Sequence, residues 1–173
     1  MSGTYELPWG FFVSGILNWN SGQPYTAGIE MSGFEMLNGI DFSGIDVPVF
    51  LDSSGNIVDM TAASGMTAEE LSAFLSGAHL QERNHYDQPS FFNIDLRLSK
   101  RFDIVDRYTI ELIGEIFNLT NENNEFVGSG NQSMFFGSER DGVYTFTRNQ
   151  DFGQVTSFRG SPRQYQVAVK FLF

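Results

Sequence analysis

The chain ends in Arg163-Gln-Tyr-Gln-Val-Ala-Val-Lys-Phe-Leu-Phe173, and this stretch carries the main prediction of the fold. Every second residue is aromatic or β-branched, whereas the residues between are mostly polar or small; the first set is Tyr165, Val167, Val169, Phe171 and Phe173. Successive side chains of a strand point to opposite faces, so the stretch predicts a strand with one apolar face. At about 3.3 Å per residue it extends roughly 35 Å, enough to cross a bilayer core at the tilt of a barrel strand. A soluble protein seldom ends on an exposed Phe-Leu-Phe, because such an edge invites aggregation.

Three other stretches alternate in the same way, and 92–104 is the clearest of them. Its apolar residues share one face and its polar or charged residues share the other, with Lys100 as the one interruption of the apolar face. A long lysine side chain near a strand end can extend its ammonium group to the membrane interface. The sequence therefore predicts strands at about 9–20, 92–104, 108–118 and 163–173.

The polar faces of the two central strands predict the lining of a barrel. Asp95 and Arg97 alternate with apolar residues in the first strand, and Glu111 and Glu115 do so in the second. A row of charged residues suits either solvent or a polar lumen. We expect these four side chains to face the lumen.

Two tryptophans, Trp9 and Trp19, lie ten residues apart in the first predicted strand. Ten residues rise about 33 Å, or roughly 25 Å when tilted, which is close to the separation of the two aromatic girdles of a membrane barrel. Trp9 and Trp19 are therefore predicted to mark the two membrane interfaces. Two buried core tryptophans are the alternative.

Long connections alternate with short ones along the chain. The first, about 21–90, contains ten acidic residues from Gly28 to Pro89 against the single Arg83, and the second covers about 119–162. Thr67-Ala-Glu-Glu70 predicts a capped short helix in the first connection, and 47–58 and 143–147 suggest hairpins. The pattern predicts an all-β fold, an antiparallel up-and-down transmembrane β-barrel segment of about four strands with two long extracellular loops.

Composition narrows the possible functions. The 173 residues include 18 Phe, 18 Gly and no Cys, and they carry a formal net charge of −11. The negative charge argues against nucleic acid as a partner, and the absence of cysteine excludes disulfides and thiol chemistry. No run of apolar residues is long enough for a membrane helix. The first residues contain no secretory signal, so we expect the sequence to be a piece of a longer exported protein.

No catalytic constellation is found in the sequence. His79 and His85 are six residues apart, which matches none of the usual metal-ligand spacings. Asp52-Ser-Ser-Gly-Asn56 lacks the acidic ligands that complete a calcium loop. We expect no enzymatic activity, no cofactor and no metal site.

Several stretches resemble the C-terminal part of TonB-dependent outer-membrane receptors, in particular the group that carries a carboxypeptidase-regulatory-like domain. They are Leu7-Pro-Trp-Gly-Phe11, Ser21-Gly-Gln-Pro-Tyr-Thr26, Asn93-Ile-Asp-Leu-Arg-Leu-Ser-Lys-Arg-Phe102, Glu115-Ile-Phe-Asn-Leu-Thr-Asn121, Phe152-Gly-Gln154 and Ser161-Pro-Arg-Gln-Tyr165. The last strand also resembles the C-terminal signal of outer-membrane barrels, which implies that Tyr165, Val167, Val169, Phe171 and Phe173 are read by the barrel-assembly machinery.

The resemblance implies a location in the bacterial outer membrane, contact with its lipid, a small ligand of unknown identity and a role in transport. It also implies a barrel of about 22 strands around a plug domain. The chain contains neither the plug nor the short N-terminal energy-coupling box, so the remaining barrel and plug would have to be supplied from outside it. A small protein that oligomerises into a membrane barrel and a soluble β-sandwich binding module are the alternatives.

Overall fold

The computed structural model of the chain describes residues 1–32, 36–37, 40–41, 47–105 and 107–173. These residues form two compact units. The sheet unit comprises Met1–Gly22, Pro89–Phe126 and Phe158–Phe173, and the loop unit comprises Gln23–Gln88 and Val127–Ser157. Each unit is assembled from segments that are distant in the sequence.

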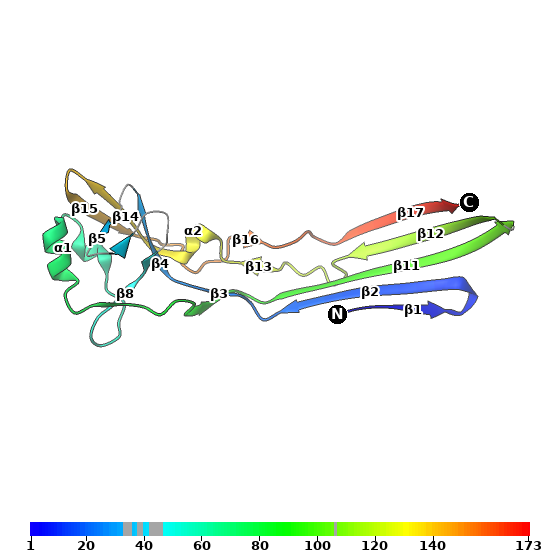
Figure 1. Cartoon of the computed structure of the whole chain (residues 1–173), viewed down its shortest axis with the longest axis horizontal. Coiled ribbons are helices and arrows are strands. Elements are labelled where there is room, and N and C mark those ends of the chain that lie inside the picture. The colour runs from blue at the N-terminus through cyan, green and yellow to red at the C-terminus, as the bar shows by residue number, and fades with distance from the viewer. Residues whose placement is uncertain (33–35, 38–39, 42–46, 106) are drawn as a thin grey trace. The chain divides into compact units, whose positions relative to one another are not determined.

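The sheet unit contains one antiparallel five-stranded sheet (Figure 1). Its strands, in spatial order, are β1 (Ser2–Leu7), β2 (Phe11–Asn20), β11 (Phe91–Val105), β12 (Tyr108–Phe117) and β17 (Gln164–Leu172). Every strand pairs with the next one in this order, so the sheet is an up-and-down meander with β1 and β17 at its edges. Short strands β13 (Glu125–Phe126) and β16 (Ser157–Phe158) lie at the sequence boundaries of the units.

The predicted strands 92–104, 108–118 and 163–173 coincide with β11, β12 and β17 to within one residue at each end. The prediction of about four strands missed β1, whose six residues include a glycine and show only a short alternation. Asp106, the centre of the predicted turn between β11 and β12, lies outside the described residues.

The start of β2 differs from the prediction because a turn occupies its first two expected residues. Pro8–Gly10 form a single 3-10 turn, η1, between β1 and β2. Trp9 has a φ of 63° and Gly10 a φ of 74°, both in the left-handed region that lets the chain reverse. Trp9 therefore lies in the turn and not in the strand, which corrects the prediction that Trp9 and Trp19 belong to the same strand.

The loop unit contains short strands and three short helices in its described residues, more structure than the one helix and two hairpins that the sequence predicted. Its strands are β3 (Pro24–Tyr25), β4 (Gly28–Ser32), β5 (Met36–Leu37), β6 (Ile40–Asp41), β7 (Val47–Pro48), β8 (Phe50–Leu51), β9 (His79–Leu80), β10 (Tyr86–Asp87), β14 (Ser133–Arg140) and β15 (Val143–Arg148). Its helices are η2 (Met60–Ala63), α1 (Ala68–Phe74) and α2 (Ser129–Gln132). None of the helices in the described residues is long and apolar enough to cross a membrane.

A four-stranded sheet joins the two predicted loops within the loop unit. Its order is β15-β14-β4-β7, and the pairing of β14 with β4 is parallel. The predicted hairpin at 143–147 is β15 paired with β14. The predicted hairpin at 47–58 forms only in part: Leu51 bridges Ile57, while β7 pairs with β4 and β8 pairs with β9.

The loop unit has its own apolar core. Its buried members are Ala27, Ile29, Val47, Val49, Phe50, Met60, Ala63, Leu71, Leu75, Met134, Phe135, Tyr144 and Phe146. Leu71 comes from α1, which begins at the predicted capping box: Glu70 N–H donates to Thr67 Oγ1, and Thr67 N–H donates to Glu70 Oε2. The predicted short helix is thus present and packs its apolar side on this core.

Candidate functional site: a sheet with two chemically opposite faces

The register of the sheet places the predicted lumen residues on one face. Arg97 of β11 lies opposite Glu115 of β12, and Arg101 lies opposite Glu111. Asp95 is two residues from Arg97 on the same strand and therefore shares its face. The structure brings Asp95, Arg97, Glu111 and Glu115 to one surface, although whether that surface faces a lumen stays a prediction.

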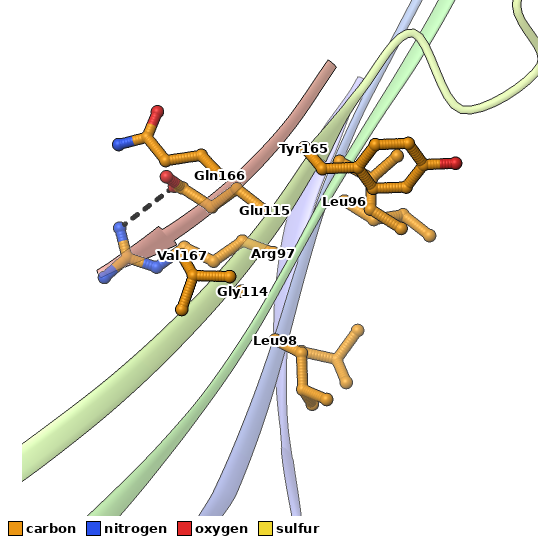
Figure 2. Close-up of a pocket in the computed structure, with 10 residues that line it drawn as sticks. Leu96, Arg97, Leu98, Gly114, Glu115, Tyr165, Gln166 and Val167 are labelled. Atoms are coloured by element: carbon orange, nitrogen blue, oxygen red, sulfur yellow. Dashed lines mark ion pairs between the residues drawn. The ribbon is translucent and has the colours of Figure 1, made fainter. Parts of the chain in front are cut away.

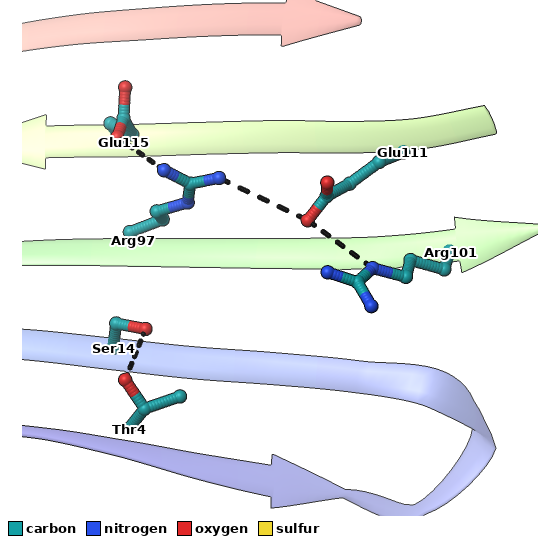
Figure 3. Close-up of polar contacts among 6 residues, drawn as sticks. All are labelled: Thr4, Ser14, Arg97, Arg101, Glu111 and Glu115. Carbon is teal, nitrogen blue, oxygen red and sulfur yellow. Dashed lines mark hydrogen bonds and ion pairs between the residues drawn. The ribbon is translucent and has the colours of Figure 1, made fainter. Parts of the chain in front are cut away.

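An ion-pair network connects β11 and β12 on this polar face (Figure 3). Arg97 pairs with Glu115 at 3.6 Å and with Glu111 at 3.9 Å, and Arg101 pairs with the same Glu111 oxygen at 3.7 Å. Glu111 is only 4% exposed. A carboxylate removed from water needs nearby cations, and two arginines provide them here. On the same face, the hydroxyls of Thr4 and Ser14 lie 3.0 Å apart and connect β1 with β2.

The opposite face of the sheet is apolar and exposed. One cross-strand row contains Tyr5, Val13, Leu98, Gly114 and Val167, and the next contains Leu7, Phe11, Lys100, Leu112 and Val169. Val167 is 83% exposed and Tyr5 is 71% exposed. Figure 2 shows Arg97 and Glu115 on one side of the strands and Leu96, Leu98 and Tyr165 on the other. An exposed apolar surface of this extent requires an apolar environment.

Aromatic rows limit this apolar face at both ends. Trp19 lies opposite Phe92 at one end, and Phe102 and Phe171 flank Ile110 in a row near the other. On β11, Phe92 and Phe102 are ten residues apart, about 33 Å along the strand and roughly 25 Å at barrel tilt. That height equals the apolar band of a membrane barrel. Phe92 and Phe102 therefore mark the two ends of the apolar face on β11, whereas the girdle role of Trp9 and Trp19 stays a prediction.

Two asparagines to which the sequence assigned no role, Asn118 and Asn124, organise one end of the sheet. Asn118 is buried, and its Nδ2 donates to the backbone oxygens of Glu122 and Ser161 at 3.0 Å each. Asn124 pairs with the backbone of Phe92 in both directions, accepting at 2.7 Å and donating at 2.9 Å. Both have positive φ, which asparagine tolerates better than most residues. They replace backbone pairing where the strands stop, and the run Asn118–Asn124 was the signal available in the sequence.

In the loop unit, Asp52 and His85 take part in local contacts. Asp52 accepts hydrogen bonds from the backbone of Ser54 and Asn56, and the bond from Asn56 is the first cause of its lowered pKa. His85 packs edge-on against Tyr86, with ring centres 5.2 Å apart. In the part of the chain that the structure describes, no group of three or more His, Asp or Glu side chains is placed to hold a metal ion.

Comparison with protein families gives one result that agrees with this two-faced sheet. The family described as "Outer membrane beta barrel domain" matches residues 5–166 of the chain. No curated protein and no solved structure matched. The matched region covers most of the chain: it includes β2, β11 and β12 completely, together with the end of β1 and the start of β17. The chain therefore belongs to the outer membrane β-barrel family and is a protein of the bacterial outer membrane.

Proposed function

We propose that the chain forms part of the wall of a TonB-dependent outer-membrane receptor, with its loop unit involved in ligand capture. The observation that carries the proposal is that the sheet unit buries a charged residue and exposes apolar ones, the opposite of a protein surrounded by water. Glu111 is buried in an ion-pair network on one face, while Val167 and Tyr5 are largely exposed on the other. A barrel wall needs this arrangement, because lipid covers the outer face and the lumen is polar. The proposed role involves no catalytic step.

The positions of the family-like stretches support the receptor identity. Leu7–Phe11 contains the β1–β2 turn, and Asn93–Phe102 lies within β11. Glu115–Asn121 contains the end of β12 and Asn118, whose side chain hydrogen-bonds to the backbone there. These stretches therefore occupy elements that set the strand register and the rim. In the proposed receptor, the plug contacts the polar face that carries Arg97 and Glu111.

Edge pairing supports the need for further strands. In the described structure β1 and β17 are the edges of the sheet. An unpaired backbone amide or carbonyl in lipid costs several kcal/mol, so both edges must find partners in the membrane. The rest of a receptor barrel is the proposed partner, and further copies of this chain are the second candidate.

The size of the polypeptide in native outer membranes separates these two candidates. An antibody raised against the exposed segment around Arg83 would be used on boiled and unboiled membrane samples. A receptor predicts one heat-modifiable polypeptide much larger than 19.4 kDa. A boiled band at the mass of the chain alone, with multiples of it in the unboiled sample, would reject the receptor in favour of an oligomer.

Protease accessibility tests the proposed topology. Arg83 of the loop unit and Arg107 beside the β11–β12 turn are both exposed in the structure. Trypsin added to intact cells should cut after Arg83 and leave Arg107 uncut, because long loops face outwards and short turns face the periplasm. Permeabilising the outer membrane should add the cut at Arg107. The reverse order would overturn the topology.

The terminal residues test the proposed contact with the barrel-assembly machinery. Phe173 is almost fully exposed, and Phe171 lies on the apolar face of the edge strand β17. Edge pairing plus an aromatic anchor is a recognised mode of strand capture. Deletion of Phe173 should lower the amount of assembled protein in the outer membrane, measured by heat modifiability. Unchanged assembly after deletion of residues 171–173 would contradict the role.

A further inference from the structure

The apolar face of the sheet carries one charged residue among the residues that the structure describes, Lys100 of β11. Its Nζ lies 4.5 Å from the ring centre of Phe11 and 4.9 Å from that of Phe102. Its direct neighbours across the sheet are Phe11 and Leu112. The ion pairs found within the described residues do not include it. Cation–π contacts hold the ammonium in place but leave its charge without a counter-ion.

A trough runs along the same face beside Lys100. One depression of about 400 Å³ is lined mainly by apolar residues, among them Leu96, Leu98, Gly114, Ile116, Tyr165 and Val167. Arg97, Glu115 and Gln166, which belong to the polar face, also border it, but its exposed lining is almost entirely apolar. A second, of about 460 Å³, is lined by Phe11, Lys100, Phe102 and Leu112 among others. The two depressions share Leu98, Gly114 and Val167, so they are continuous. Each falls in the size range of small-ligand sites, roughly 300–1,000 Å³.

Gly114 makes the middle of the trough. A Cβ added at Gly114 would meet no atom within 4 Å, so the missing side chain leaves open space between Leu98 and Val167. Any larger residue would fill this part of the row. The trough therefore results from one glycine between aliphatic neighbours, and it leads to the one cation of the face.

We propose that this trough binds an anionic phospholipid of the outer membrane, with an acyl chain over Gly114 and the headgroup phosphate at Lys100. The inference uses the membrane location of the chain and does not require the receptor identity. A lysine on a lipid-facing strand is costly near the middle of the bilayer, and the cost falls towards the interfaces. A phosphate offsets that cost through a charge-assisted hydrogen bond.

A lipid fits these features better than a protein neighbour does. The trough is apolar along its length and charged at one end, which is the chemical pattern of a phospholipid. Lys100 lies on the β11 half nearer to the short β11–β12 turn, and its ammonium contacts Phe102 on that side. The headgroup would therefore lie at the interface on the turn side of the sheet.

Lipid retention by the full chain tests the proposal. The chain, purified in detergent, would be mixed with equal amounts of phosphatidylglycerol and phosphatidylcholine, and bound lipid would be counted by native mass spectrometry. The wild type should prefer phosphatidylglycerol roughly tenfold: both headgroups carry a phosphate, but the choline ammonium of phosphatidylcholine repels Lys100 and competes with it for that phosphate. Lys100→Gln should abolish the preference, and Lys100→Arg should restore it. Inorganic phosphate at the lipid concentration should displace nothing, because it has no acyl chain.

Two matched controls separate the site from general effects. Lys170→Gln removes the same charge from the polar face, where Lys170 lies opposite Glu111, and should keep the preference. Gly114→Leu should lower the retention of both lipids severalfold, whereas Gly3→Leu adds the same side chain to the apolar face outside the trough and should not. Equal loss in Lys100→Gln and Lys170→Gln, or unchanged retention in Gly114→Leu, would overturn the proposal. Displacement of the lipid by inorganic phosphate would overturn it as well.

Discussion

The two units of this chain bury opposite kinds of residue. In the loop unit, Ile29 and Phe135 are completely buried, and none of the charged residues whose burial the structure describes is buried. In the sheet unit, Glu111 is 4% exposed while Val167 is 83% exposed. The loop unit follows the rule for a protein surrounded by water, and the sheet unit follows the rule for one surrounded by lipid.

The burial pattern of one unit thus suits water, and the burial pattern of the other suits lipid. The apolar residues of the loop unit gain from leaving water by packing on one another. Those of the sheet unit are exposed on one face, where we propose that they contact acyl chains instead of an apolar core. Apolar residues of the same types are therefore buried in one unit and exposed in the other, and the fold decides which of the two occurs.

The largest effect is expected for Phe135→Ala in the loop-unit core. Removal of a fully buried phenylalanine side chain leaves a cavity, which should lower the free energy of unfolding of this unit by about 3–5 kcal/mol. Phe136→Ala is the matched control, because Phe136 is the next residue of β14 and is 37% exposed. Pulse proteolysis in urea measures both variants. Equal losses would mean that the loop unit has no core of the kind described.

A charge on the lipid face should have the next largest effect. Val167→Arg places a cation midway along the apolar face of the edge strand β17 and should cost about 2–4 kcal/mol in a bilayer. Gln166→Arg, the adjacent residue on the polar face, should cost little because it extends beside Glu115. The test is a refolding titration in lipid vesicles. Similar penalties for the two variants would remove the distinction between the faces.

The buried carboxylate of the sheet gives a smaller effect. Glu111→Gln leaves Arg97 and Arg101 without a shared counter-ion and should lower stability by about 1–3 kcal/mol. Glu115→Gln removes one ion pair from a more exposed position and should cost about 0.5–1 kcal/mol. Urea unfolding in vesicles measures both. A larger loss of stability for Glu115→Gln than for Glu111→Gln would contradict the role of Glu111 as the carboxylate shared by Arg97 and Arg101.

The helix cap of the loop unit should have the smallest effect. Thr67→Ala removes the side-chain acceptor for Glu70 N–H and should cost about 1 kcal/mol, measured by pulse proteolysis. Asp59→Ala at the start of η2 provides a comparison with a different cap.

The same cap predicts a pH dependence. Hydrogen bonds from the backbone and then the side chain of Thr67 lower the pKa of Glu70 below 4.5. The stabilisation by the ionised Glu70 is therefore complete above the unfolded-state pKa of 4.5, and it is lost as the pH falls through the lower pKa of the folded state. The stability difference between the wild type and Glu70→Ala should shrink over that acidic window. A difference that grows on acidification would contradict the bond from Thr67.

Local patterns in the sequence determined the strands β11, β12 and β17, their two faces and the capped helix α1. The reason is physical: strand alternation has a period of two residues, and a capping box spans four, so both are encoded in consecutive residues. The lengths of the two predicted connections, about 21–90 and 119–162, also indicated long segments outside the sheet. Asp95, Arg97, Glu111 and Glu115 could be assigned to one kind of face for the same reason.

Tertiary structure alone decided the features that depend on register or on distant segments. The sharing of Glu111 between Arg97 and Arg101 requires the pairing of β11 with β12. The pairing of β14 with β4 joins two segments more than one hundred residues apart, and no local period encodes it. Strand β1 is stabilised by its partner β2 across a turn at Trp9, since its own short alternation is too weak to predict a strand. The trough over Gly114 likewise exists only because Leu98 and Val167 lie beside it on neighbouring strands.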